Sequence, residues 1–485
     1  MWRLHFAVLL IVLFACTDQT EPPPAVATSD PNGVASDDGA SGIEMELNFG
    51  GIDREARTAL SGGATTVFKD GEDAFETAAP NLSGDHLERH ETGDEAFSLV
   101  HVQGTGANGG LGPVFDNESC ESCHLGDGRG RPPIVQGEAF SSMLFRSSIT
   151  GKDANGGPLG IPGGFGGQLQ MRATAGSQAD IQAAVYYVEN RGIFSDGTEF
   201  QLHEPHYTLA GSYPGLPASF LFSPRVAPVV FGLGLLEAVP DFLILARSDP
   251  RDFNRDGISG RANIVYDAVH GRRAVGRFGW KANTPNLIQQ TAGAYNGDMG
   301  VTSDLFPSES CAGRSEPACN TAHAAEVNQQ TVADVAFYTQ TLAVPARRNL
   351  NDPTARRGEF IFYAAGCDGC HTPTLRTGVL RGLPEVSNQV IHPYTDLLVH
   401  DMGPGLADGR PDFQASGSEW RTPPLWGIGL VEAVNDHSRF LHDGRAYSLM
   451  EAVLWHGGEA KRARDRITRL PQRDRDALIA FLKSL

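Results

Sequence analysis

Two pentapeptides of the form Cys-x-x-Cys-His are the residues of this 485-residue chain best suited to chemistry. They read CESCH at positions 120–124 and CDGCH at positions 367–371. In such a motif the two thiols attach a haem covalently and the adjacent histidine binds its iron. A zinc site would need four converging ligands and would not explain a histidine directly after each second cysteine. We therefore predict two covalently bound haem c groups, held by Cys120, Cys123 and His124 and by Cys367, Cys370 and His371.

Three further cysteines lie outside these motifs. Cys311 and Cys319 are close together in the chain, and we expect them to form a disulfide that closes a short loop. A disulfide would suit an oxidising compartment. A free, reactive dithiol is the alternative for this pair.

The amino terminus is typical of an exported protein. Residues 4–15 form an almost continuous apolar run, shorter than the roughly 20 residues that a membrane-spanning helix needs. The sequence LFAC at 13–16 resembles the bacterial lipobox, which implies that Cys16 carries a lipid; an ordinary secretory signal is the alternative. We expect a lipoprotein signal peptide over residues 1–16, a disordered tether over 17–57, and a periplasmic protein anchored to the membrane. Thr17 after Cys16 resembles the rule for sorting to an outer membrane.

The charge of the chain excludes nucleic acid as a partner. Asp and Glu outnumber Lys and Arg by 58 to 39, which gives a formal net charge of −19. Affinity for nucleic acid comes mainly from basic side chains that neutralise phosphates. The acidity suits a basic protein partner, or simply keeps the protein soluble.

The chain contains an internal duplication. Residues 228–241 (PVVFGLGLLEAVPD) align without gaps to residues 423–436 (PPLWGIGLVEAVND), with eight identities in fourteen positions. Each segment is followed by Phe-x-x-Asp-Gly, at 253–257 and at 440–444. Apolar residues at helical spacing precede the second Cys-x-x-Cys-His motif and end each half of the chain. The first half is longer because of an insertion at about 130–222, which contains a Gly-rich stretch and two strand-like runs joined by Ser-Asp-Gly.

These features together resemble the di-haem cytochrome c peroxidase and MauG family. Stretches such as LGPVFDNESCESCHLGDGRGRPP, GFGGQLQ, HDMGPGLADGRPDF and LHDGRAYSLMEAVLWHGGEA are closer still to its di-haem oxidoreductase branch, whose members are also labelled thiol oxidoreductases. The resemblance covers about residues 58–485. It implies a mainly α fold of two cytochrome c-like domains related by the duplication, at 58–345 and 346–485, with the Gly-rich, partly β insertion in the first.

The resemblance also implies two unequal haems. One needs a coordination position that peroxide can occupy, and the other has a sixth ligand that tunes its potential. Relatives place an axial Met or Tyr between the second motif and the repeated segment, so we expect Met402 to bind the second iron. His400 and Met299 are alternative ligands, and a packing role is the alternative for Met402.

Glu237, in the repeated LLEAV, is the candidate acid–base residue beside the first haem. A carboxylate there could take the proton of peroxide and return it to the departing oxygen. Glu432 occupies the same place in the second repeat, which favours a shared structural role as strongly. Gln168 and Gln170 in the Gly-rich stretch are alternative polar groups at the first haem.

Trp280 and a calcium-like loop are further expectations. Relatives use a Trp to relay electrons between haems, although a Trp beside Phe also suits a core. Asp252, Asn254 and Asp256 form the start of a calcium loop, D-x-N-x-D-G, but position 12 is Asn263 instead of the usual Glu. Calcium between the haems would match the relatives.

The sequence therefore predicts an exported di-haem c-type peroxidase. Hydrogen peroxide would be reduced at one haem, with electrons relayed through the other from a small cytochrome c or cupredoxin. One alternative is a MauG-like enzyme that oxidises a protein or organic substrate, which the insertion favours. The other is an electron carrier without catalysis, which would need a strong ligand on both irons.

Overall fold

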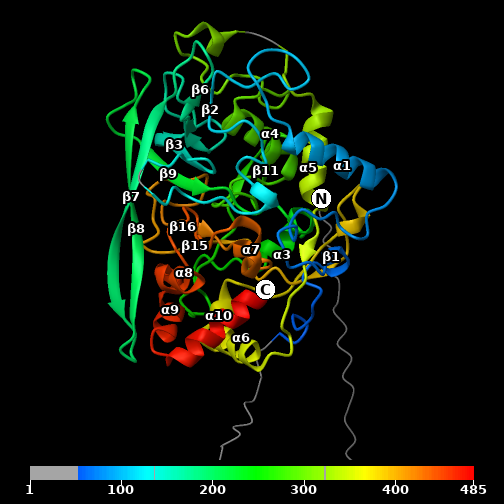
Figure 1. Ribbon diagram of the computed structural model, residues 1–485, viewed down its shortest axis with the longest axis vertical. Helices are drawn as coiled ribbons and strands as arrows, with labels where there is room; N and C mark the ends of the chain where they lie inside the picture. The colour runs from blue at the N-terminus through cyan, green and yellow to red at the C-terminus, as the bar shows by residue number, and fades with distance from the viewer. Residues whose placement is uncertain (1–52, 136, 322–323) are drawn as a thin grey trace, which may run out of the picture. The chain divides into compact units, whose positions relative to one another are not determined.

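The computed structural model describes residues 53–485 except 136 and 322–323 (Figure 1). The expected signal peptide, Cys16 and nearly all of the expected tether lie outside these residues. Within the described chain, no helix is both long and apolar enough to cross a bilayer.

Two pairs of packed helices lie next to the Cys-x-x-Cys-His motifs in the chain. They are α1 (Asp85–Ser98) with α5 (Gln329–Thr341), and α6 (Pro353–Ala365) with α10 (Gln472–Ser484) (Figure 1). In each pair the helices approach most closely at a glycine. A Cβ on Gly93 of α1 would collide with the carbonyl oxygen of Asp334, and a Cβ on Gly358 of α6 would collide with the carbonyl oxygen of Ala477. The two backbones can approach this closely only because those residues lack a side chain.

The repeated segments of the two halves contact each other reciprocally. Gly232 and Gly427 both adopt left-handed φ angles, of 69° and 70°. A Cβ on Gly232 would lie 2.7 Å from the Trp426 ring, and a Cβ on Gly427 would lie 2.5 Å from the Phe231 ring. The aromatic residue of each repeat therefore packs on the glycine of the other.

Two further helices begin in the same way in the two halves. α4 (Leu287–Met299) is capped by the side chain of Asn286, and α8 (Leu449–Trp455) is capped by the side chain of Ser448. Eight residues before each cap, Phe278 and Phe440 make the same type of isolated antiparallel bridge. The structural counterpart of residues 440–444 is therefore 278–282, and the match to 253–257 expected from the sequence is wrong.

The expectation of a mainly α fold is also wrong. The structure is 27% helical and 20% strand, with several small sheets. Most of the strand lies in the insertion, where β7 (Ile181–Ile193) and β8 (Glu199–Gly211) pair along their whole length. In the same region β3 (Met143–Lys152) pairs with β4 (Pro158–Leu159), β5 (Gln168–Leu169) and β9 (Leu221–Val226). The strand-like runs of the insertion are real, but most other strands have only two to four residues, too few for an alternating pattern.

The remaining helices and strands are short. The helices are α2 (Leu233–Glu237), α3 (Asp241–Leu245), α7 (Val431–Asn435) and α9 (Lys461–Ile467). The strands are β1 (Thr66–Val67), β2 (Val114–Phe115), β4 (Pro158–Leu159), β5 (Gln168–Leu169), β6 (Arg172–Ala173), β9 (Leu221–Val226), β10 (Ile264–Asp267), β11 (Arg272–Val275), β12 (Val344–Pro345), β13 (Leu375–Arg376), β14 (Val390–Ile391), β15 (Val399–Asp401) and β16 (Glu419–Arg421).

The β7–β8 hairpin connects the insertion to the second half of the chain. β8 contacts α8, and the turn of the hairpin reaches the last helices, where Asp196 pairs with Arg475 at 2.8 Å (Figure 1). The backbone N–H of Ser195 donates to the carbonyl of Thr468 at 3.1 Å. Contacts of this kind join residues 51–485 into one compact unit, so a domain boundary at 345 stays a prediction based on the duplication.

Replacing Gly358 with Ala should destabilise the protein. The new methyl group would overlap the Ala477 carbonyl and push α6 away from α10, at a cost of about 1–3 kcal/mol. Chemical denaturation of the purified holoprotein measures this cost. Gly71→Ala is the matched control, because Gly71 is exposed and the nearest atom to its added Cβ is 3.7 Å away. Equal stability of the two variants would contradict the close approach.

Candidate functional site

One cavity of about 840 Å³ joins the two Cys-x-x-Cys-His motifs. Cys120, Cys123 and His124 line it together with Cys367, Cys370 and His371. Much of the remaining wall is aromatic or aliphatic, including Trp280, Trp420 and Trp426. An apolar cavity with two sets of thiols and imidazoles fits two haem groups.

The two motif histidines are oriented as iron ligands. Nδ1 of His124 donates to the carbonyl of Pro228 at 2.7 Å, and Nδ1 of His371 donates to the carbonyl of Tyr394 at 3.0 Å. A carbonyl can only accept, so Nδ1 carries the proton and Nε2 keeps its lone pair. Burial lowers the pKa of both imidazoles, that of His371 to about 4, which keeps them neutral as metal ligands must be.

The four motif cysteines are free thiols. Each lies at the cavity wall beside its histidine. They are therefore available for thioether bonds to haem.

His400 is already occupied by other groups. Its Nε2 donates to Asp396 at 2.8 Å and its Nδ1 donates to Glu459 at 2.8 Å. Burial alone would lower the pKa of His400, but these hydrogen bonds hold it well above its ordinary value. With a proton on both ring nitrogens, His400 has no lone pair for a metal, whereas Met402 lines the cavity.

His456 is a cavity residue to which the sequence assigns no role. It follows the last residue of α8, and its Nδ1 donates to the carbonyl of Ala452 at 2.7 Å. Its ring centroid lies 6.5 Å from that of His371. The sequence could have singled out His456 by its distance from the helix cap. That distance can be compared between the two halves only when they are aligned at Phe278 and Phe440.

Glu237 is engaged in structural hydrogen bonds. One carboxylate oxygen accepts from the backbone N–H of Leu287 at 2.9 Å, and the other accepts from the side chain of Gln340 at 2.5 Å. It therefore ties the first turn of α4 to α5, and it is not among the described residues that line the cavity. Glu432, its counterpart in the repeat, is exposed.

Gln168 lies behind a pair of acidic residues near the first motif. Its Nε2 is 2.8 Å from Asp116 Oδ2, 2.9 Å from Asp298 Oδ1 and 2.8 Å from the Gly297 carbonyl. Both carboxylates line the cavity. Burial, together with the charge of Asp298, raises the pKa of Asp116 to about 8. Two carboxylates that share one amide can hold a proton at neutral pH.

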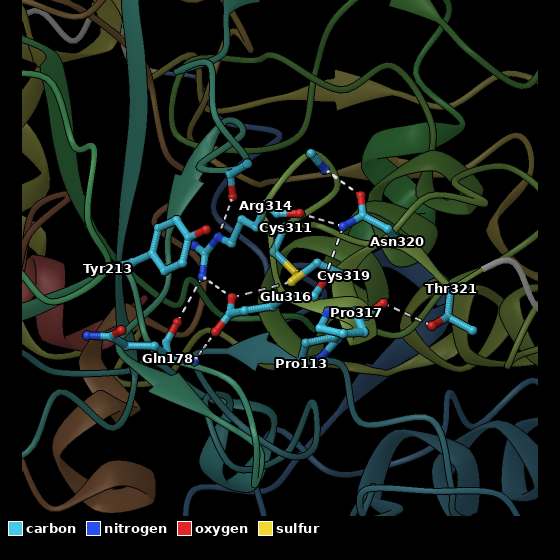
Figure 2. Close-up of a disulfide and its surroundings, with 12 residues drawn as sticks. Pro113, Gln178, Tyr213, Cys311, Arg314, Glu316, Pro317, Cys319, Asn320 and Thr321 are labelled. Carbon is cyan, nitrogen blue, oxygen red and sulfur yellow. Dashed lines mark hydrogen bonds and ion pairs between the residues drawn. A yellow bond between two sulfur atoms is a disulfide. The ribbon is translucent and has the colours of Figure 1, made fainter.

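The expected disulfide between Cys311 and Cys319 is confirmed (Figure 2). Both residues are buried, at 0% and 1% exposure, so neither sulfur is accessible as a reactive dithiol. Between them along the loop, Arg314 stacks on Tyr213 and donates to the carbonyl of Gly164 at 3.0 Å (Figure 2). The disulfide loop therefore supports the Gly-rich stretch that carries Gln168.

Trp280 lies in the wall of the cavity that both motifs share. Its Nε1 donates to the carbonyl of Val226 at 2.9 Å, and the guanidinium of Arg129 lies 5.1 Å from the ring centroid. It is 6% exposed, so it has a packing role in addition to its place beside the motifs.

The calcium-like loop shows no metal geometry. The side-chain amide of Asn254 donates to Asp256 at 2.9 Å, and the neighbouring surface carries Arg255, Lys461 and Arg462. Across the part of the chain that the structure describes, no three His, Cys, Asp or Glu residues are grouped as a metal site requires. The structure therefore lends no support to calcium at this loop.

Comparison with known proteins gives one family. Residues 56–485 match the model of the family described as "Di-haem oxidoreductase, putative peroxidase". No curated protein matches the chain.

Replacing Glu237 with Ala should reduce stability. Leu287 N–H and Gln340 would both lose their acceptor in a largely buried setting, at a cost of about 1–3 kcal/mol of unfolding free energy. The exposed Glu432 gives the matched control, and Glu432→Ala should change stability by less than about 0.5 kcal/mol. Denaturation midpoints of the holoproteins measure both. If Glu237→Ala were as stable as Glu432→Ala, the anchoring role would be wrong.

Proposed function

Because the chain belongs to the di-haem oxidoreductase family, as its resemblance predicts, we propose that it reduces hydrogen peroxide at one haem with electrons that enter through the other. The balanced reaction takes one H₂O₂, two protons and two electrons and gives two molecules of water. The observation that carries the proposal is the single cavity lined by both Cys-x-x-Cys-His motifs.

We extend the proposal to covalent attachment of both haems as haem c. Four free thiols at the cavity wall, each pair followed by a neutral histidine with an available Nε2, support it. When bound, the haem supplies the redox chemistry that no side chain of the chain can supply. His124 and His371 would hold the two irons, and Trp280 would occupy part of the wall between them.

Proton transfer at the first haem is assigned to Asp298 in this proposal. Asp298 lies on α4 and lines the cavity beside the first motif. Its Oδ1 accepts from Gln168, whose amide also donates to Asp116. Gln168 therefore acts as a positioning residue, and Asp116 can store a proton behind Asp298. Glu237, expected from the sequence in this role, is committed to Leu287 and Gln340 instead.

The proposal also covers the compartment of the protein and its electron donor. We propose export as a periplasmic lipoprotein, with electrons supplied by a small cytochrome c or cupredoxin. The Cys311–Cys319 disulfide suits an oxidising compartment. The net charge of −19 suits a basic electron donor.

Peroxide-dependent oxidation of a reduced small cytochrome c tests the function. The wild-type holoprotein should oxidise the donor only when peroxide is present. Variants that lose one attachment site, Cys120→Ala/Cys123→Ala or Cys367→Ala/Cys370→Ala, should each lose this turnover, because one haem reacts and the other relays. Turnover that survives the loss of either haem would contradict the relay. Peroxide consumption only in the presence of an organic or protein substrate would indicate the MauG-like alternative, and no reaction with peroxide would indicate a carrier.

Replacing Asp298 with Asn should slow peroxide reduction by about 10²–10⁴-fold, the usual contribution of a positioned acid–base group. The amide keeps the size of the side chain but cannot exchange a proton. Asp304→Asn is the matched control, because Asp304 is exposed and lies a few residues further along the chain. The measurement is the rate of donor oxidation at saturating donor, with haem content determined for each variant. An unchanged rate in Asp298→Asn would remove this residue from the reaction.

A further inference from the structure

His371 and His456 face each other across the cavity at a spacing that fits one iron. Each ring donates from Nδ1 to a main-chain carbonyl, which leaves Nε2 with its lone pair. Two imidazoles that bind one metal from opposite sides, at about 2 Å per nitrogen, have ring centroids roughly 6.3 Å apart. The observed separation of the centroids is 6.5 Å.

The counterpart of His456 in the first half is Ala294. His456 is eight residues beyond the cap Ser448 of α8, and Ala294 is eight residues beyond the cap Asn286 of α4. Ala294 lines the same cavity and lies on α4, whose residue Asp298 accepts with its main-chain carbonyl from the N–H groups of Asp116 and Asn117, just before the first motif. A methyl group cannot bind a metal, so this position can supply a ligand in the second half but not in the first.

One helical turn earlier, the residues are polar in the first half and apolar in the second. Gln290 of α4 stands where α8 has Ala452, and Thr291 stands where α8 has Val453. All four residues line the cavity. The first half therefore combines a small residue with an amide and a hydroxyl, which can bind a small polar molecule, whereas the second half combines apolar residues with an imidazole.

We propose that His456 is the sixth ligand of the second haem iron and that the first haem, with Ala294 at the equivalent place, is open for peroxide. The ligand assignment stands on the geometry of the two histidines. The assignment of peroxide to the first haem rests on the proposed function. His400 is excluded as the ligand by its two carboxylate partners, and Met402 is the rival that the experiment must separate.

Spin state measured by optical and paramagnetic resonance spectra of the oxidised holoprotein tests the ligand. His456→Ala should convert the second haem from low spin to high spin. His456→Met should keep it low spin, add a sulfur-to-iron charge-transfer band and raise its reduction potential, because a thioether stabilises the reduced iron. This second variant keeps a ligand in place, so it separates loss of the ligand from loss of the fold.

Met402→Ala tests whether Met402, and not His456, is the sixth ligand of the second iron. Under the proposal it leaves the second haem low spin, with the same spectrum as the wild type. A high-spin second haem in Met402→Ala, together with an unchanged spectrum in His456→Ala, would overturn the assignment of His456.

Ala294→His tests the open position from the other side. The new imidazole should bind the first iron, convert that haem to low spin and abolish its reaction with peroxide. A first haem that stays high spin in this variant would overturn the equivalence of the two positions. If the spectra of all variants change as expected but the wild type does not react with peroxide, the ligand assignment stands and the proposed function fails.

Discussion

The reciprocal contact between the two repeated segments is the constraint on which the site depends. Trp426 packs on Gly232 and Phe231 packs on Gly427, so neither repeat can move without the other. Two residues further on, Gly234 and Gly429 lie directly against backbone carbonyls of α5 and α10, at Gln340 and Lys483. Each repeat is thus fixed both to the terminal helix of its own half and to the opposite half. The carbonyl that orients His124 belongs to Pro228, in the first of these segments, so the orientation of this imidazole follows from the same contact.

The acidic pair near the first motif is held in place by residues from distant parts of the chain. The Cys311–Cys319 loop carries Arg314, which binds Gly164 and pairs with Asp180. Asp180 in turn accepts from the backbone N–H of Gln170, and the side chain of Gln170 donates to the Gly297 carbonyl next to Asp298. The buried disulfide in this way helps to determine the geometry of the acidic pair. The label thiol oxidoreductase finds no basis in this buried pair.

The sequence predicts those features of this protein that depend on residues close together in the chain. It does not predict features that depend on contacts between distant residues. The haem motifs and the disulfide are set by residues close in the chain, and the family resemblance follows from such stretches. The partners of Glu237 could not be predicted, because one of them, Gln340, is 103 residues away and only the fold brings them together. The mainly α expectation failed because the β7–β8 hairpin and many two-residue strands add strand content that periodicity alone does not reveal. The Phe-x-x-Asp-Gly match at 253–257 pointed away from the structural counterpart at 278–282, which is recognised by its bridge and which aligns His456 with α4.

The duplicated scaffold explains how two similar halves can support different chemistry. A side-chain cap and the same type of bridge precede both α4 and α8, so the eighth residue after the cap comes at a corresponding place in each half, inside the 13-residue α4 and directly after the 7-residue α8. Under the proposal above, the side chain at this place meets the haem of its own half. An imidazole and a methyl group at this one position differ in whether they can donate a lone pair, which is the property that separates a closed iron from an open one. Under the proposal that His456 binds the second iron, a duplication that keeps the frame and varies this residue divides electron storage and substrate binding between the two haems.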